Sequence, residues 1–495
     1  MNELPQNLYT AAQMQRLDRM AIDEAGIDGY ELMCRAGAAA FDALRRHWPN
    51  ARRVLVCCGK GNNGGDGYVI ARLALEAGLQ ARVLAMASPE ALAGDAARAA
   101  SDWVAAGGEV ALWGEQADAL EAMAPEVVVD ALFGTGLERA VEGRWRNLIE
   151  AINTGDWGRL AVDIPSGLSA DTGCVLGVAV QADVTATFIG LKRGLFTADG
   201  PQQAGQLVFD DLAVPARVYA SEPAALSRVG SDDVAAILIP RPRNAHKGHF
   251  GHVLVVGGAP GMSGAARMAG EAAQRVGAGL VSVATAPAHA AMLNAGRPEL
   301  MCAGVDNARE LAPLLARATV VALGPGLGQG AWGRAMFAAV SETRLPVVMD
   351  ADALNLLAAE PVVNPDRIIT PHPGEAGRLL GCGAGEINRD RFAAVAALVN
   401  RYGGVALLKG AGTLVADQQQ CALVDRGNPG MASGGMGDVL TGVIAGLLAQ
   451  GLTPFDAARL GAWLHGRAAE LAASDGERGL LASDLFDPLR RLVNP

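Results

Sequence analysis

The stretch GKGNNGGDG, residues 59–67, joins an apolar run at 54–58 to a helix-like run at 68–78. A strand, a glycine-rich turn and a helix in this order are typical of a sheet that is covered by helices. The spacing G-x-G-x-x-G inside the stretch fits a dinucleotide-binding fingerprint, and the loop then adds G-D-G. The sequence therefore predicts an α/β layer here and raises the question of what the loop holds.

Glycines let the backbone approach a ligand closely, and a helix N-terminus favours an anion. The same glycines could serve only a tight turn, with Asp66 as the helix cap. A turn needs far fewer Gly and Asn residues than this loop contains, which favours a ligand site. A nicotinamide dehydrogenase would also need an acidic residue at the end of the next strand, to bind the ribose. That strand ends in Ala85-Met86-Ala87, so the sequence argues against hydride transfer.

Short apolar runs alternate with Ala- and Leu-rich helical stretches along the whole chain. In the first half the runs lie at 52–58, 81–87, 126–134, 159–167 and 183–190. In the second half they lie at 252–258, 279–285, 319–326, 346–352, 367–375 and 404–413. Runs without polar alternation suit strands that are buried on both faces, so the sequence predicts an α/β fold built on parallel sheets.

The alternation loses its regularity once, at residues 211–233, where Pro, Ser and charged residues cluster as in a linker. A chain of 495 residues also favours more than one folding unit. We therefore expect a first domain at 1–215, a linker at 216–225 and a second domain at 226–495. Each domain would be a three-layer αβα sandwich with its loop motifs at the carboxyl ends of the strands, where ligands bind in such sheets.

The composition narrows the class of function. The net charge of −11 argues against nucleic acid as a partner. No apolar run reaches membrane-spanning length, and the first twenty residues lack the regions of a secretory signal. The seven cysteines form no CxxC pair, which indicates reduced thiols. We expect a cytoplasmic protein without membrane contact, and we expect it to form a homo-oligomer.

Two strand ends of the first half carry carboxylates, Asp130 in VVVDALFGTGL and Asp163 in AVDIPSGL. A single Asp at such a position often only caps a helix or bonds to a loop. Two of them in one sheet, each followed by a glycine-containing loop, favour a site. Asn63, Asp130 and Ser166 would offer amide, carboxylate and hydroxyl oxygens, which suit a hard cation rather than zinc. Ser166 is not expected to be a nucleophile, because no GxSxG elbow surrounds it.

These motifs carry a resemblance. GNNGGDG, VDALFGTGL and VDIPSGL occur in the order that is found in the N-terminal YjeF domain, and the upstream stretches YTAAQMQRLD and LMCRAGAAA extend the likeness over the first half. Cys34 departs from it, because an acidic residue is expected there. Members of that family are epimerases of hydrated NADH and NADPH (NADHX and NADPHX). The resemblance therefore implies a Rossmann-like domain that interconverts the R and S hydrates at C6 of the damaged nicotinamide ring.

The resemblance also implies roles for single residues. Asp163 would be the acid–base residue, because a proton must be taken up and returned as the C6–O bond breaks and reforms. Asn63, Asp130 and Ser166 would coordinate a potassium ion. The hydrated dinucleotide would be held by Asp163 together with Asn62, Asn63, Gly64, Gly65, Asp66, Gly134, Thr135, Gly136, Leu137, Glu138, Arg139 and Ala140.

The second half has its own row of motifs, of which GNPGMASGGMGDVL at 427–440 is the most informative. Its glycines open a strongly helical run, and glycine amides at a helix N-terminus form an anion hole. Asp438 could cap that helix, whose dipole would keep the carboxylate ionised and lower its basicity. It could instead take a proton from a hydroxyl group as a phosphoryl group arrives. The presence of KGAGT at 409–413 favours the second role, because its lysine would complete a nucleotide site.

From about residue 225 onward the chain resembles the ribokinase-like superfamily and, more closely, its NAD(P)HX dehydratase branch, the C-terminal YjeF domain. Asp438 would be the base, and Glu375 would lie near the magnesium ion that accompanies ADP. Lys409, Gly410, Ala411, Gly412, Thr413 and Gly437 would bind the nucleotide. The hydrated cofactor would contact His372, Asp438, one of Ala265 and Ala266, and one of Gly326 and Gly328.

Together the two halves predict a bifunctional NAD(P)HX repair enzyme. The first half would epimerise NADHX or NADPHX, and the second would dehydrate the S hydrate to NADH or NADPH with ADP as co-substrate. One alternative is a thiazole-type or ribokinase-type small-molecule kinase with a regulatory N-terminal domain. Another is a non-catalytic interaction module in the first half, which the combination of Asn63, Asp130 and Asp163 disfavours.

Overall fold

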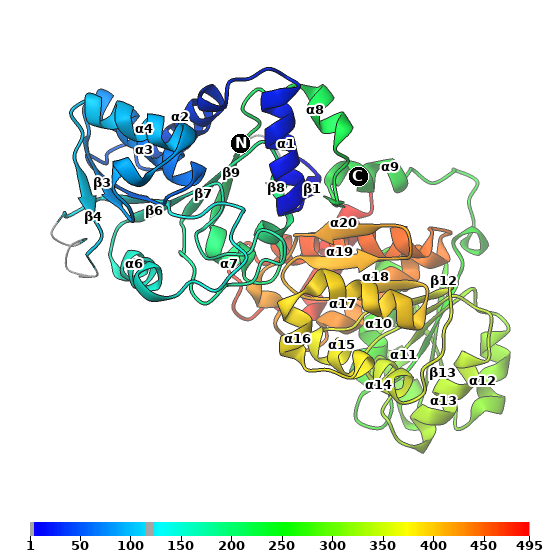
Figure 1. The fold of residues 1–495 in the computed structure, drawn as a ribbon. Coiled ribbons are helices and arrows are strands. Elements are labelled where there is room, and N and C mark those ends of the chain that lie inside the picture. The colour runs from blue at the N-terminus through cyan, green and yellow to red at the C-terminus, as the bar shows by residue number, and fades with distance from the viewer. Residues whose placement is uncertain (1–3, 115–119, 121–122, 495) are drawn as a thin grey trace. The chain divides into compact units, whose positions relative to one another are not determined.

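The protein is described by a computed structural model that covers residues 4–114, 120 and 123–494. The chain divides into two compact units, Met1–Leu226 and Ser227–Pro495. Each unit places a twisted sheet between helices (Figure 1), which confirms the predicted α/β class. Residues 216–225, predicted as a linker, include a short helix and belong to the first unit.

The first unit opens with β1 (Asn7–Tyr9), α1 (Ala11–Asp23) and α2 (Gly29–His47). Alternating elements follow: β2 (Arg53–Cys58), α3 (Asn62–Glu76), β3 (Gln80–Ala85), α4 (Gly94–Ala105), β4 (Val110–Leu112), β5 (Val127–Ala131), α6 (Gly143–Thr154), β6 (Gly158–Val162) and β7 (Val184–Phe188). The unit continues with β8 (Leu191–Lys192), α7 (Gly200–Ala204), β9 (Gln206–Asp210) and α8 (Ala216–Ser221).

The main sheet of the first unit has the order β4-β3-β2-β5-β6-β7-β9, and all neighbouring strands run parallel. Through β7 this is the Rossmann order 3-2-1-4-5-6. Side chains of α2, α3 and α4 pack on one face of the sheet, and those of α6 pack on the other. The strand order reverses between β2 and β5, and such a switch point is where open α/β sheets bind their ligands.

The second unit begins with β10 (Leu226–Arg228), α9 (Ser231–Ile237), β11 (His252–Val256), α10 (Ser263–Arg275), β12 (Leu280–Thr285), α11 (Ala290–Gly296), β13 (Met301–Gly304), α12 (Ala308–Leu315), β14 (Val320–Leu323) and α13 (Ala331–Ser341). It continues with β15 (Val347–Met349), α14 (Asp352–Ala359), β16 (Arg367–Ile369), α15 (Pro373–Leu380), α16 (Ala384–Arg389), α17 (Arg391–Tyr402), β17 (Val405–Leu408), β18 (Thr413–Ala416), β19 (Cys421–Val424), α18 (Met436–Ala449), α19 (Pro454–Ala472) and α20 (Phe486–Leu492).

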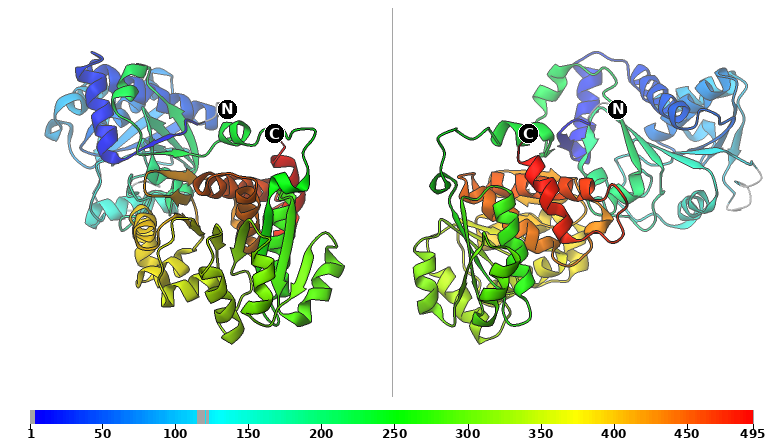
Figure 2. Two further views of the ribbon diagram at one scale, coloured as in Figure 1. Left: turned by 90° about the vertical axis from the view of Figure 1, so that its right-hand side faces the viewer. Right: turned by 180° about the vertical axis from the view of Figure 1, so that it is seen from behind.

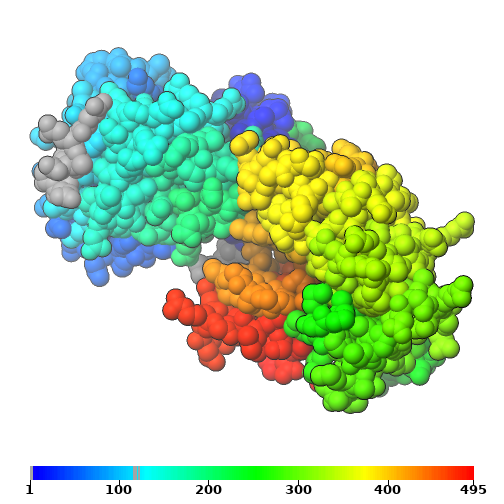
Figure 3. All heavy atoms as spheres, turned by 90° about the horizontal axis from the view of Figure 1, so that it is seen from below, coloured from blue at the N-terminus to red at the C-terminus, as the bar shows by residue number. Residues whose placement is uncertain are grey.

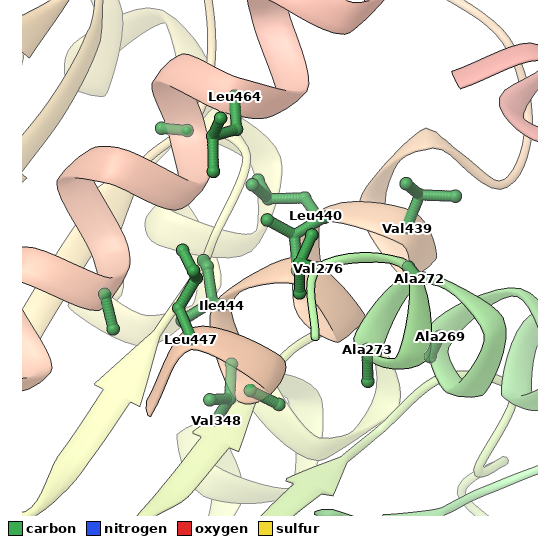
Figure 4. Close-up of a cluster of buried hydrophobic side chains, with 14 of the residues drawn as sticks. Ala269, Ala272, Ala273, Val276, Val348, Val439, Leu440, Ile444, Leu447 and Leu464 are labelled. Atoms are coloured by element: carbon green, nitrogen blue, oxygen red, sulfur yellow. The ribbon is translucent and has the colours of Figure 1, made fainter. Parts of the chain in front are cut away.

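The sheet of the second unit runs β13-β12-β11-β14-β15-β16-β17-β18-β19-β10 and switches direction between β11 and β14. The strands from β13 to β17 are parallel, whereas β17, β18 and β19 pair antiparallel. Helices α10, α18 and α19 bury their apolar faces together against one face of the sheet, as the close-up in Figure 4 shows. The views of Figure 2 show helices on both faces of this sheet, and Figure 3 shows all heavy atoms of the chain as spheres.

A membrane-spanning helix must be both long and apolar. None of the described helices combines the required length with sufficient apolar character. All seven cysteines carry free thiols.

Candidate active sites

A cavity of about 980 Å³ opens at the switch point of the first unit. Its wall is formed by α1, the start of α3, the loop that follows β5, and β8. The residues predicted for a ligand that line it are Asn62, Asn63, Asp66, Gly134, Thr135, Gly136, Leu137, Glu138, Arg139 and Asp163. Side chains that lie far apart in the sequence therefore meet in one space.

Helix α3 begins earlier than the sequence indicated. It starts at Asn62 with Gly61 as its N-cap, so most of the expected glycine loop is the first turns of the helix. The interpretation of Asp66 as the helix cap is therefore wrong. Asp66 is the fifth residue of the helix, and its carboxyl group lies on the cavity wall.

Asn63, Asp130 and Ser166 gather beside the cavity. The Ser166 hydroxyl donates to Asp130 Oδ1 at 2.6 Å, and the Ser166 backbone N–H donates to Oδ2 at 2.8 Å. The Asn63 amide group donates to the Phe133 carbonyl at 2.9 Å, while Asn63 Oδ1 is buried and has no hydrogen-bond donor. Burial raises the pKa of Asp130 to about 6, although the bonds from Ser166 lower it.

Asp163 follows β6 in a left-handed backbone conformation with φ of 70°, a region that Asp tolerates better than most residues. Lys192 donates to Asp163 Oδ1 in a very short ion pair. The ammonium group of Lys192 is only 1 % exposed and also donates to Thr187 Oγ1 at 3.0 Å and to the Phe188 carbonyl at 3.1 Å. These three bonds use all the protons of the ammonium group.

Asp66 and Asp18 line the cavity together with this ion pair. Burial raises the pKa of Asp66 well above its usual range, and the charges of Asp163 and Asp18 raise it further. The side chain of Asp18 is open to the cavity. Partial desolvation by the surrounding protein raises the pKa of Asp18 to about 6, and the charge of Asp163 adds to the rise. The cavity therefore places the ion pair of Lys192 and Asp163 near two aspartates, Asp66 and Asp18, whose pKa values are raised.

In the second unit, α18 begins after Gly435, which is the N-cap and has a left-handed φ of 92°. Asp438 lies in the first turn, so its interpretation as the cap is wrong. The expected lowering of its basicity by the helix dipole is also wrong, because burial and the charge of Asp350 raise the pKa of Asp438 to about 7. A carboxylate with this proton affinity is well suited to act as a base near neutral pH.

Lys409 connects the strand ends that surround Asp438. Its ammonium group donates to Asp350 Oδ1 at 2.8 Å and lies 3.7 Å from Glu375 Oε2. Thr441 donates to the other oxygen of Asp350 at 3.0 Å. Burial lowers the pKa of Lys409, but the nearby carboxylates outweigh it, so that the pKa lies above its usual value. A Cβ atom on Gly437 would lie 3.1 Å from Asp350 Oδ2, which places the start of α18 directly against this network.

His372 is the N-cap of α15. Its Nδ1 accepts a hydrogen bond from the Gly374 N–H at 3.0 Å, and its own backbone N–H donates to Glu375 Oε2 at 2.9 Å. The capping geometry fixes the ring, and the side chain is half exposed. Nε2 lies 3.5 Å from Glu375 Oε1, so the imidazole and the Lys409 network share one carboxylate.

Arg391 shapes the KGAGT loop (residues 409–413). This residue is 2 % exposed, and one of its terminal nitrogens donates to the carbonyl groups of Leu408, Lys409 and Gly412 at 3.2–3.3 Å. A Cβ atom on Gly410 would lie 2.8 Å from the guanidinium group. The loop therefore wraps around a buried cation, which turns its carbonyl groups inward.

Comparisons with known proteins identify both halves. The family described as "YjeF-related protein N-terminus" matches residues 29–194, and that described as "NAD(P)H-hydrate dehydratase" matches 253–491. A bifunctional NAD(P)H-hydrate repair enzyme of Coxiella burnetii is 50% identical over 490 residues, which cover 99% of each chain. The Escherichia coli protein of the same description is 47% identical and covers 99% of this chain and 95% of its own. The chain belongs to the family of bifunctional NAD(P)H-hydrate repair enzymes.

Two solved structures resemble part of this repair enzyme. A hypothetical protein of Streptococcus mutans is 31% identical, with a TM-score of 0.51, over 54% of this chain and 98% of its own. A ribokinase-like superfamily protein of Enterococcus faecalis is 26% identical, with a TM-score of 0.50, over 54% of this chain and 94% of its own. The Rossmann-like and ribokinase-like folds and the repair function are thereby confirmed. The full-length relatives decide against a thiazole-type kinase and against a non-catalytic module.

Some of the residues predicted for a ligand lie outside the cavity of the repair enzyme. Gly64 and Gly65 pack instead against a backbone carbonyl and a methionine side chain, and Ala140 is not part of the wall. In the second unit Ala266 is fully buried whereas Ala265 is half buried, and Gly326 is buried whereas Gly328 is half exposed. Ala265 and Gly328 are therefore the members of each pair that a ligand could reach.

Other residues of the repair enzyme escaped the sequence analysis, namely Asp18, Lys192, Asp350 and Arg391. Lys192 and Arg391 lie in ordinary-looking segments, and only the fold shows that their charges are buried. Asp350 did carry a signal, since it ends a strand in the MDADALN motif. Asp18 falls in an amphipathic helix, where the pattern predicts a solvent-exposed residue.

Proposed function

We propose that the first unit epimerises NADHX and NADPHX in its cavity, with Asp163 as an acid–base residue. The observation that carries this proposal is the meeting of the α3 start, the loop after β5 and Asp163 around one space of about 980 Å³. That volume is suited to a dinucleotide rather than a small metabolite. Asn62, Asn63, Asp66 and residues 134–139 would contact the hydrated dinucleotide.

We also propose that Asn63, Asp130 and Ser166 hold a potassium ion beside this cavity. The residues fit such an ion, because Asn63 Oδ1 is a buried acceptor without a donor and the other two side chains contribute oxygens only. The ion would supply a fixed positive charge behind the substrate. If so, potassium should protect the amides of α3 and of the loop after β5 from hydrogen exchange. Choline at equal ionic strength should not do so, and equal exchange in both salts would contradict the site.

For the second unit, Asp438 is proposed as the base of an ADP-dependent dehydration. Asp438 would take the proton of the C6 hydroxyl as this oxygen attacks the terminal phosphoryl group of ADP and AMP leaves. The C6–O bond would then break with phosphate as the leaving group, and loss of a ring proton would restore the dihydronicotinamide. Phosphorylation matters because hydroxide is a poor leaving group.

The network around Lys409 supports this assignment of the second unit. Lys409 to Thr413 and Gly437 would bind the nucleotide, and Glu375 would lie near its magnesium ion. Ala265, Gly328, His372 and Asp438 would face the hydrated cofactor. A cytoplasmic location and a homo-oligomer belong to the same proposal, and the free thiols agree with the first of these.

Two variants of the full chain test which unit catalyses which reaction. Asp438→Asn should abolish the recovery of NADH from both hydrates, because both routes end in the dehydration step. Asp163→Asn should leave the S hydrate repaired at the wild-type rate and the R hydrate slow. Unchanged conversion of the R hydrate by Asp163→Asn would show that the acid–base assignment is wrong.

A further inference from the structure

Asp66 has a property that substrate contact alone does not explain. Its side chain is 9 % exposed and lies on the cavity wall. Within the described part of the chain no hydrogen-bond donor serves its carboxyl group. An ionised carboxylate that is buried without a donor is costly, so the group retains its proton. Asp66 therefore presents an unpaired carboxylic acid to whatever fills the cavity.

Asp163, in the same cavity, has the opposite environment. Lys192 donates to its Oδ1 and has no proton left for another partner. The ammonium group of Lys192 balances the negative charge of Asp163. Oδ2 of Asp163 faces the loop after β5, where a Cβ atom on Gly134 would lie 3.8 Å away. One carboxyl group that is paired with a cation and another that has no donor, in the same cavity, are the arrangement of an acid–base pair.

We propose that Asp66 is a second catalytic residue of the epimerase, which donates a proton to the departing C6 hydroxyl while Asp163 accepts a proton from the incoming water. This inference rests on the proposed epimerase function of the first unit. It divides between two residues the proton transfers that a single acid–base residue would otherwise perform in both directions.

The step balances in atoms and charge. The ring nitrogen N1 donates its lone pair to C6, the C6–O bond breaks, and the hydroxyl leaves as water with the proton of Asp66. A water molecule then adds to C6 of the iminium ion from the other face, the N1–C6 π electrons return to N1, and the released proton goes to Asp163. Proton exchange with water in the cavity returns Asp66 to its acid form and Asp163 to its carboxylate. No oxidant or other co-reactant is needed.

Other charged groups border the cavity and bear on its pH dependence. Those that line it, besides Asp66, Asp163 and Lys192, are Asp18 on α1, Lys60 before α3, Asp95 on α4, and Glu138 and Arg139 in the loop after β5. Asp18 is the main alternative to Asp66 as a proton donor. Its side chain is open to water, which can solvate and ionise it, whereas Asp66 is enclosed. The matched variants of these two residues therefore decide which one donates.

The test uses the full chain and the purified R hydrate with ADP and Mg²⁺. Asp66→Asn should slow conversion of the R hydrate at least about 100-fold, the typical minimum contribution of a general acid. Dehydration of the S hydrate by the same chain should stay unchanged, and the affinity for the R hydrate should stay within about threefold, since asparagine keeps the shape. Asp18→Asn should slow conversion of the R hydrate far less than Asp66→Asn does, at most about tenfold. Asp66→Glu, which keeps the acid, should recover part of the rate.

Several outcomes would overturn the inference. R-hydrate conversion by Asp66→Asn within about threefold of wild type would do so, as would a large loss confined to Asp18→Asn. If Asp66→Asn does not fold, the pH profile of wild-type R-hydrate conversion decides. The rate should fall at alkaline pH, where a required proton donor loses its proton. A rate without such a fall would refute Asp66 as the donor. A wild-type chain that cannot convert the R hydrate at all would instead refute the proposed function.

Discussion

Lys192→Met removes the cation that pairs with Asp163 and keeps the aliphatic length of the side chain. Lys192 is 1 % exposed, and the carboxylate of its partner Asp163 is 19 % exposed. The substitution also leaves the buried Thr187 hydroxyl without this donor. Asp163 would then be a largely enclosed negative charge without its ion-pair partner.

Breaking a buried ion pair by removal of one partner costs about 3–5 kcal/mol. The partial exposure of Asp163 lets water solvate the orphaned charge, so we expect the lower end of this range. At about 1.4 kcal/mol per factor of ten, a cost of 3 kcal/mol corresponds to opening of the surrounding structure that is roughly 100-fold more frequent. The effect should be confined to the first unit, because each unit has its own core.

Hydrogen exchange of the peptide that covers β7 and β8 measures this change, with β14 of the second unit as internal reference. Lys247→Met is the matched control, since Lys247 is an exposed lysine in a short turn of the second unit. We expect faster exchange only in Lys192→Met, together with loss of R-hydrate conversion and normal S-hydrate dehydration. Exchange within about threefold of wild type would refute the structural role assigned to the buried lysine.

Three further predictions follow from the geometry of the sites. Asp438 must be ionised to act as a base, and its pKa is raised to about 7. The rate of S-hydrate dehydration should therefore fall about tenfold for each pH unit below 7. A rate that does not change between pH 5 and pH 8 would exclude Asp438 as the base. Arg391→Met should raise the KM for ADP at least about tenfold, because the KGAGT loop would lose the cation that holds its carbonyl groups. R-to-S conversion should be retained. An unchanged KM for ADP would contradict this role of Arg391. In a denaturant titration, Gly59→Ala should destabilise the first unit by several kcal/mol, because its Cβ atom would lie 1.9 Å from a backbone carbonyl oxygen. Gly61→Ala is the control. Its Cβ atom would meet open space, so it should cost less than about 1 kcal/mol.

The central strands of both sheets were predictable from the sequence because they are buried on both faces. All eleven predicted runs contain strands. The edge strands β4, β9 and β13 were not predicted, since they are short and partly exposed and so lack a continuous apolar signal. The β18–β19 hairpin also escaped, because its four-residue strands follow the KGAGT loop without a clear boundary.

The site was predictable as far as its motifs extend. Asn63, Asp130, Ser166 and Asp163 were found from strand ends and glycine loops, and the fold brings them together. Lys192 could not be found in this way, because its importance depends on burial and on a carboxylate 29 residues away in the chain. Pairings of this kind are set by the packing of the sheet, which local sequence patterns do not report.

The central claim is that one chain returns both hydrates to the reduced cofactor. The most direct measurement incubates the wild-type protein with a mixture of the R and S hydrates, ADP and Mg²⁺, and follows the absorbance of the restored dihydronicotinamide. We predict that the absorbance rises until both hydrates have been consumed. Recovery of neither hydrate would contradict the account.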